Sequence, residues 1–286
     1  MKDAGGDGDE GRPADEGSFD IELAFGLEIA ARAGRLLMER YERVERIDYK
    51  SARDVVTEVD HLSEALILDA IRDAYPHDGI LAEESGEHAA VRTVKPPQGS
   101  AADTARVWVI DPVDGTINYA NGIPFFCVSV ALLVDGRPAV GVIHDPARLE
   151  TFSAAVGGPA RLDGRPIVPS DKDRLSDFVI SMSLSGRSVA RRAQAVRKAI
   201  RVSRSMGSAA LALVYVANGR FDAFVQQGGL SAWDVAAAGL IAEQAGASVT
   251  DMAGGSWFDV ARGPRSIGLV AAPAAHHATL LELVRT

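Results

Sequence analysis

The stretch Val107-Trp108-Val109-Ile110-Asp111-Pro112-Val113-Asp114-Gly115-Thr116 joins an apolar strand to a group of oxygen ligands. Its first four residues are apolar and mostly β-branched, which predicts a buried strand. Pro112 fixes φ in a sharp turn after the strand, and Gly115 permits a conformation that a side chain would forbid. The turn should bring the carboxylates of Asp111 and Asp114 and the threonine hydroxyl to one point, as hard divalent cations require. A polar turn that only closes a strand would contain the same residues.

Acidic residues recur at other ends of predicted elements. A second short strand, Gly79–Ala82, runs into Glu83. Downstream, Asp234 opens an Ala-rich apolar segment that stops at Gly246, so we expect a buried helix with this carboxylate in its first turn. Asp60 opens another periodic helix. Both of these aspartates could serve only as helix caps, because Asp is a preferred N-terminal residue.

Taken together, these segments resemble the inositol monophosphatase family of magnesium-dependent, lithium-sensitive sugar-phosphate phosphatases. The matching stretches are D-V-V-T-E-V-D (54–60), G-I-L-A-E-E-S (79–85), W-V-I-D-P-V-D-G-T-I-N-Y (108–119) and W-D-V-A-A-A-G (233–239). The order and approximate spacing of all four stretches fit, and the resemblance runs from Ile21 to the C-terminus. The combination of W-x-x-D-P-x-D-G-T-x-N with a distant W-D is specific.

The resemblance implies a site for two or three Mg²⁺ ions. Glu83, Asp111 and the main-chain carbonyl of Val113 match the family's ligands to the first metal. Asp111, Asp114 and Asp234 match the ligands to the second, with Asp111 bridging the two ions. Glu83 and waters would hold a third ion. The expected metal ligands are therefore Glu83, Asp111, Val113, Asp114 and Asp234.

Phosphate chemistry agrees with this set. A phosphate monoester is a dianion attacked by a negative nucleophile, so two cations that hold the attacking and leaving oxygens favour the reaction. Mg²⁺ suits shared carboxylates, and the absence of His and Cys from the ligand set argues against zinc. The resemblance adds Thr116 and Asp60 as a hydrogen-bonded pair that helps orient the attacking water. The expected catalytic residues are Thr116, Asp60 and Glu83.

Substrate contacts are expected from the start of the apolar helix after Met206. Its small first residues would let backbone N–H groups approach an anion, although Ser208 could be only an N-cap. In the family this turn contacts the sugar or polyol, whereas Gly115 and Thr116 lie at the phosphate. The expected substrate-binding residues are Asp114, Gly115, Thr116, Gly207, Ser208, Ala209, Gln226 and Asp234.

One departure from the family concerns specificity. Inositol-selective members have a glutamate shortly before W-D that binds substrate hydroxyls. In this chain the position falls on Gln226 when counted from Gly207 and on Gln227 when counted back from Asp234. Either way an amide replaces the carboxylate and loses charge-assisted hydrogen bonds. We therefore do not expect a myo-inositol phosphate to be the dominant substrate.

The sequence predicts Mg²⁺-dependent hydrolysis of a small phosphate monoester, either inositol monophosphate or a related sugar or polyol phosphate. Alternatives in the same class are histidinol-phosphate, fructose-1,6-bisphosphate and 3′-phosphoadenosine 5′-phosphate phosphatases. An alternative of another class is a regulatory binding protein of the same fold, since some bacterial family members act on the transcription machinery. The clustered carboxylates argue against a purely structural role, because holding uncompensated charges together is costly. We expect a homodimer.

Composition indicates a cytoplasmic protein without membrane or nucleic-acid partners. The chain has one cysteine, Cys127, no signal-peptide pattern and no apolar run long enough to span a bilayer. The net charge is −9, and a basic stretch between Arg187 and Arg204 is expected to form a solvated helix face. Residues 1–18 are rich in Gly and acidic residues, and we expect them to form a disordered tail.

The predicted elements alternate in a pattern typical of an α+β fold. A helix is expected at 20–41, a second at 60–75, a loop beside the site at 88–104, and then antiparallel strands that include 127–134 and 139–144. We expect an N-terminal half, 19–175, with the metal motifs and a C-terminal half, 176–286, that completes the site. The resemblance implies a layered α/β/α/β/α sandwich of the inositol monophosphatase and fructose-1,6-bisphosphatase type.

Overall fold

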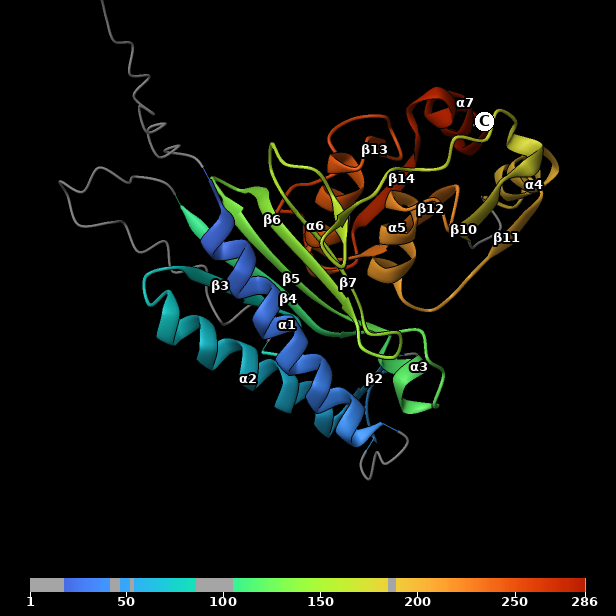
Figure 1. Ribbon diagram of the computed structural model, residues 1–286. Helices are drawn as coiled ribbons and strands as arrows, with labels where there is room; N and C mark the ends of the chain where they lie inside the picture. The colour runs from blue at the N-terminus through green and yellow to red at the C-terminus, as the bar shows by residue number, and fades with distance from the viewer. Residues whose placement is uncertain (1–17, 42–46, 52–53, 86–104, 185–188, 286) are drawn as a thin grey trace, which may run out of the picture.

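The computed structural model describes residues 18–41, 47–51, 54–85, 105–184 and 189–285. These residues form two large sheets and the helices that cover them (Figure 1). The expected loop at 88–104 and all of the expected tail except Ser18 lie outside the described residues. Among the described residues, no helix has the length and apolar composition that a membrane crossing requires.

The larger sheet has seven strands in the spatial order β3-β4-β5-β6-β7-β8-β9. β3 and β4 are parallel, and every later pair of neighbours is antiparallel. The strands are β3 (Gly79–Ala82), β4 (Arg106–Asp114), β5 (Cys127–Val134), β6 (Arg137–Asp145), β7 (Glu150–Ala155), β8 (Arg161–Leu162) and β9 (Arg165–Pro166). The expected antiparallel pairing of β5 with β6 is confirmed, and their connecting turn has φ of 50° at Asp135 and 76° at Gly136.

The smaller sheet has five strands in the order β11-β10-β12-β14-β13. β10 is parallel to both of its neighbours, whereas β14 is antiparallel to both of its own. The strands are β10 (Val179–Ser183), β11 (Val202–Arg204), β12 (Ala223–Leu230), β13 (Ala247–Asp251) and β14 (Ile267–Pro273). A separate hairpin pairs β1 (Ile47–Ser51) with β2 (Asp54–Thr57).

Helices complete five layers, α/β/α/β/α, so the predicted fold class is confirmed (Figure 1). α1 (Asp20–Arg40) and α2 (Glu58–Ala74) cover one face of the larger sheet. α5 (Ala209–Ala217) and α6 (Ala232–Gln244) lie between the two sheets. α4 (Ala190–Ala199) and α7 (Ala274–Arg285) pack on the outer face of the smaller sheet. The short helices are α3 (Thr116–Ala120) and the 3-10 turn Leu175–Asp177.

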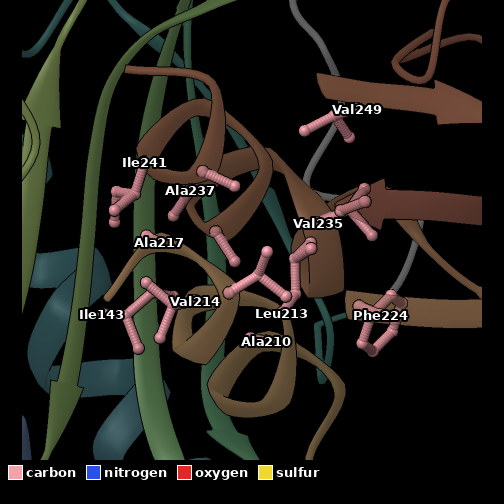
Figure 2. Close-up of a cluster of buried hydrophobic side chains, with 14 of the residues drawn as sticks. Ile143, Ala210, Leu213, Val214, Ala217, Phe224, Val235, Ala237, Ile241 and Val249 are labelled. Carbon is pink, nitrogen blue, oxygen red and sulfur yellow. The ribbon is translucent and has the colours of Figure 1, made fainter. Parts of the chain in front are cut away.

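The middle layer explains why its helices are rich in alanine. α5 and α6 are buried on nearly all sides because each has a sheet on two opposite flanks. Figure 2 shows Val214 beside Ile143 of the larger sheet, and Phe224 of the smaller sheet on the other side of the same cluster. A Cβ on Gly141 would lie 2.7 Å from the carbonyl oxygen of Ala237, so α6 contacts β6 backbone to backbone. Small side chains permit this spacing.

Two predicted boundaries are corrected. β4 does not end at Ile110, because the strand continues through Asp114. α2 begins at Glu58 rather than at Asp60, because Thr57 is the N-cap and Asp60 is the third helical residue of a capping box. The hairpin β1–β2 and the helix α3 had no counterpart in the sequence-based expectation. The division into two halves at residue 175 stays a prediction.

Candidate active site

A bulge in β4 brings the first two aspartates to the same side of the strand. Asp111 pairs with Ser129 of β5, and Asp114 pairs with Cys127, so β4 has one residue more than its partner over this interval. In a regular strand, side chains three positions apart point to opposite faces. Because of the extra residue, the side chains of Asp111 and Asp114 point to the same face of the sheet. This bulge replaces the sharp turn that the sequence suggested.

Three carboxylates meet at this point. Oxygen atoms of Asp111, Asp114 and Asp234 all lie within 4.8 Å of one another. Glu83, at the end of β3, lines the same cavity of about 150 Å³. The described residues that line the cavity include no Lys or Arg. The donors are hard carboxylate oxygens from β4, from the start of α6 and from the end of β3, and this set fits a divalent metal site.

The charges of this cluster repel one another. Burial raises the pKa of Asp111 well above its usual range, and the nearby carboxylates of Glu83, Asp114 and Asp234 raise it further. Burial and the charge of Asp114 also raise the pKa of Asp234 well above its usual range. Perturbed carboxylates in a cleft are typical of functional sites. A bound cation would remove the repulsion, because its charge opposes that of the carboxylates.

Asp114 is held by the N-terminus of α5. Its Oδ2 accepts hydrogen bonds from the Ser208 hydroxyl and from the Ala210 N–H (2.7 Å), and its Oδ1 accepts one from the Ala209 N–H (3.2 Å). The N–H groups of Ala209 and Ala210, at the start of α5, therefore bind this carboxylate, and the expected substrate contact of Ala209 stays a prediction. A carboxylate has about four acceptor positions, so one on Oδ1 is left for a metal ion.

Thr116 and Asp60 are hydrogen bonded to each other. The Thr116 hydroxyl lies 3.0 Å from Asp60 Oδ1 and 3.0 Å from the carbonyl oxygen of Val113, and its single proton can serve either acceptor. Asp60 Oδ2 accepts hydrogen bonds from both the backbone N–H and the hydroxyl of Thr57. Burial raises the pKa of Asp60, whereas these hydrogen bonds oppose the rise. Asp60 is therefore both part of the capping box and the partner of Thr116.

Glu83 is positioned by a residue that sequence reasoning missed. Glu64, buried on α2, accepts hydrogen bonds from the backbone N–H groups of Glu84 and Ser85, each at 2.7 Å. The Glu83 N–H donates to the carbonyl oxygen of Ile110 on β4 (3.3 Å). The segment that follows β3 is thereby tied to α2 and to β4. The only sequence signal for Glu64 is an acidic residue on the buried face of a predicted helix.

A second cavity, of about 270 Å³, adjoins the metal cluster and shares Asp114, Gly207 and Asp234 with it. Gln226 lines this cavity, whereas Gln227 is exposed. Of the two glutamines that the sequence left open, the structure thus places Gln226 beside the cluster. The remaining lining residues are mostly small or hydroxyl-bearing: Ser181, Ser183, Ser205, Met206, Ser208, Ala209, Phe224, Gly229 and Leu230. Ser181 and Ser183 were missed, although alternate serines on a strand were a usable signal.

Comparison with known proteins decides the family. The model of the inositol monophosphatase family matches residues 21–286. The chain belongs to this family. A Thermotoga maritima protein named fructose-1,6-bisphosphatase/inositol-1-monophosphatase is 35% identical over 237 residues, which are 81% of this chain and 85% of that protein. The Escherichia coli protein named Nus factor SuhB is 36% identical over 241 residues, with 82% and 86% covered.

Solved structures show the same inositol monophosphatase fold. The extragenic suppressor protein suhB from Bartonella henselae superimposes with a TM-score of 0.80 at 31% identity, and 93% of this chain and 99% of that chain are covered. The IMPase from Thermotoga maritima gives a TM-score of 0.78 at 32% identity, with 93% and 97% covered. The family is of the phosphatase type, and the aspartate cluster of this chain fits its metal dependence.

Removal of metal should make stability depend on pH through this cluster. A carboxyl whose pKa is raised in the folded state contributes stability that is complete below its unfolded value, 3.8, and is lost as pH rises through the folded value. In EDTA we therefore expect the melting temperature to fall as pH rises, and Mg²⁺ should reverse the fall. His144 and His277, whose pKa values burial lowers, act in the opposite direction.

The matched measurement is the difference between the wild type and Asp111→Asn at each pH, because both proteins contain the same histidines. The variant should have the higher melting temperature in EDTA, and its advantage should grow with pH. If the difference in melting temperature stays constant across pH, the charge of Asp111 is not a source of the repulsion within the carboxylate cluster.

Proposed function

We propose that this protein hydrolyses a small phosphate monoester with Mg²⁺ as its metal cofactor. The observation that carries the proposal is the cluster of Asp111, Asp114 and Asp234, which adjoins a cavity lined by hydroxyl groups. The residues that would hold two or three Mg²⁺ ions are Glu83, Asp111, Asp114, Asp234 and the carbonyl of Val113. Bound Mg²⁺ would supply positive charge at the phosphate oxygens and make water more acidic.

The chain itself would orient the attacking water through Thr116. If the Val113 carbonyl binds a metal ion, the Thr116 hydroxyl donates its proton to Asp60 Oδ1, which lies 3.0 Å away. The hydroxyl oxygen then has free lone pairs that can accept a proton of the water. Asp60 is held in turn by Thr57, so the direction of the Thr116 hydroxyl is determined before substrate arrives.

The cavity favours an uncharged polyol or sugar as the alcohol portion of the substrate. Besides the carboxylates of Asp114 and Asp234 that it shares with the metal cluster, its described lining residues supply hydroxyls and one side-chain amide, from Gln226, and no Lys or Arg. Such groups both donate and accept hydrogen bonds, as sugar hydroxyls do. A second phosphate would find no cation among these lining residues, so a monophosphate suits the cavity better than a bisphosphate.

The test is phosphate release from a panel of phosphates with Mg²⁺ and with EDTA. The panel contains myo-inositol 1-phosphate, glycerol phosphate, fructose 1,6-bisphosphate, histidinol phosphate and 3′-phosphoadenosine 5′-phosphate. We expect metal-dependent release, fastest from a sugar or polyol monophosphate. Absence of release from every substrate at millimolar concentration with Mg²⁺ would overturn the proposal.

Substrate choice should depend on Gln226. Wild-type kcat/KM for myo-inositol 1-phosphate is expected not to exceed that for the best competing phosphate. Gln226→Glu should move selectivity toward inositol by about ten- to hundredfold, because a charge-assisted hydrogen bond to a buried hydroxyl is worth roughly 1.5–3 kcal/mol. Gln227→Glu is the matched control, since its side chain is exposed. A wild type that already prefers myo-inositol 1-phosphate tenfold would contradict the argument.

A second candidate function is regulatory binding, which the relatives named Nus factor SuhB favour. Asp111→Asn separates the two candidates, because it should remove phosphate release and leave a binding surface intact. Binding of candidate partners to the wild type and to the variant would then be compared directly. The homodimer, the lithium sensitivity and the cytoplasmic location stay predictions.

A further inference from the structure

Asn118 joins the two sides of the candidate site. It lies in α3, two residues after Thr116, and only 7% of its surface is exposed. Its side-chain amide donates hydrogen bonds to the carbonyl oxygens of Phe125 and Met206, each at 2.7 Å. Phe125 precedes β5 of the larger sheet, whereas Met206 belongs to the loop that leads from the smaller sheet into α5. The bond to Met206 therefore connects α3 to a loop that lies 88 residues further along the chain.

The backbone around this amide leaves no room for another side chain. Gly207 has a φ of 85°, and a Cβ there would lie 2.8 Å from the Asn118 side-chain nitrogen. Gly115 has a φ of 100°, and a Cβ there would lie 3.1 Å from the Phe125 carbonyl oxygen and 3.2 Å from the Ser208 Cβ. Both glycines adopt the left-handed region that favours glycine. The Asn118 amide thus fills the space where the two segments meet.

The loop that this amide holds lines the substrate cavity. Ser205, Met206, Gly207 and Ser208 are all lining residues, and Ser208 also donates to Asp114. Thr116, the first residue of the same short helix, lines the cavity of the metal cluster. Asn118 therefore sets the distance between the groups expected to act on the phosphate and those expected to contact the alcohol. Such fixed distances lower the entropic cost of reaching the reactive geometry.

We propose that Asn118 is a positioning residue that holds the loop Ser205–Ser208 in the conformation that binds the alcohol portion of the substrate. The proposal rests on the proposed phosphatase function. An amide suits the position because it offers two N–H donors to two carbonyls without adding charge to the acidic cluster. An aspartate would turn an oxygen toward carbonyl oxygens and repel them.

The kinetic test compares Asn118→Ala and Asn118→Asp with Asn121→Ala. Asn121 is the matched control, because its exposed amide bonds only to the Ile117 carbonyl within α3 among described groups. For the best substrate of the panel, we expect KM to rise about tenfold in both Asn118 variants. A tenfold loss of affinity corresponds to about the free energy of one hydrogen bond. The inhibition constant of inorganic phosphate, which needs no alcohol contacts, should change less than about twofold.

A second readout does not need activity. The amide hydrogens of Ala209, Ala210 and Leu211 donate to Asp114 and Ser208, so their exchange reports whether the loop stays in place. Exchange should accelerate in Asn118→Ala and not in Asn121→Ala. If Asn118→Ala does not fold, Gly207→Ala disturbs the same contact from the cavity side and should give the same result.

The outcomes are distinct. A parallel rise of KM and of the phosphate inhibition constant, or unchanged exchange, would overturn the role of Asn118. A wild type that releases no phosphate would overturn the proposed function instead, and the exchange data would still decide whether Asn118 holds the loop.

Discussion

Asp111→Asn is expected to lower kcat at least about a thousandfold, which corresponds to roughly 4 kcal/mol in the barrier. Asp111 is 1% exposed and lies at the β4 bulge, with Asp114 and Asp234 around it. An amide has the same shape but no charge, so it cannot bridge two cations at comparable strength. The measurement is steady-state phosphate release at saturating Mg²⁺ and substrate.

Two controls separate chemistry from folding in this experiment. Asp69→Asn makes the same chemical change on the exposed side of α2 and should leave kcat unchanged. The melting temperature of Asp111→Asn in EDTA should exceed that of the wild type, because a repelled charge has been removed. Retention of more than about a tenth of kcat, a loss of only ~1.4 kcal/mol, would contradict the assignment.

Thr116→Ala should lower kcat by about a hundredfold or more, within the range for a positioned proton-transfer group. The Mg²⁺ concentration for half-maximal activity should change less than about twofold, because the hydroxyl is expected to orient water rather than to bind metal. Thr116 Oγ1 lies 3.0 Å from Asp60 Oδ1, so the lost hydroxyl also leaves that buried carboxylate with one donor fewer. Parallel titrations of Mg²⁺ with the wild type and the variant measure both quantities.

Thr116→Ser is the matched control for this prediction. Serine keeps the hydroxyl and lacks the methyl group, so Thr116→Ser should recover most of kcat. If the packing of the methyl group were what mattered, Thr116→Ser would lose as much kcat as Thr116→Ala. The opposite pattern would make Thr116 a structural support of the metal site: Mg²⁺ affinity would fall sharply, and saturating metal would restore kcat.

Local sequence patterns were sufficient to predict most of the helices and strands and to locate the acidic motif. The predicted helix at 20–41 corresponds to α1 (Asp20–Arg40), and the predicted strand at 127–134 corresponds to β5. These elements are specified by residues that are near one another in the chain, through apolar periodicity and turn signals. The hairpin β1–β2 was missed, although Ile47-Asp48-Tyr49-Lys50 alternates apolar and polar side chains; its partner strand Asp54–Thr57 does not alternate.

Contacts across the two sheets were beyond local reasoning. No local pattern predicted that Asn118 would bond to Met206, or that Asp114 would bind the N–H groups at the start of α5. Glu64, which holds the segment after Glu83, was missed for the same reason. In each case the partners are far apart in the chain, so only the packing of the layers brings them together.

By itself the sequence determined the family, the fold class and the types of residue at the centre, because D-P-x-D-G-T and a distant W-D require particular side chains at particular spacings. Tertiary structure alone decided which side of each strand those residues occupy. The bulge in β4 turns Asp111 and Asp114 to one face, and the pairing of Gln226 with Ser183 puts Gln226 rather than Gln227 in the cavity. The physical reason is the two-residue period of a strand: a shift of one residue reverses every side chain, and only strand pairing sets that shift.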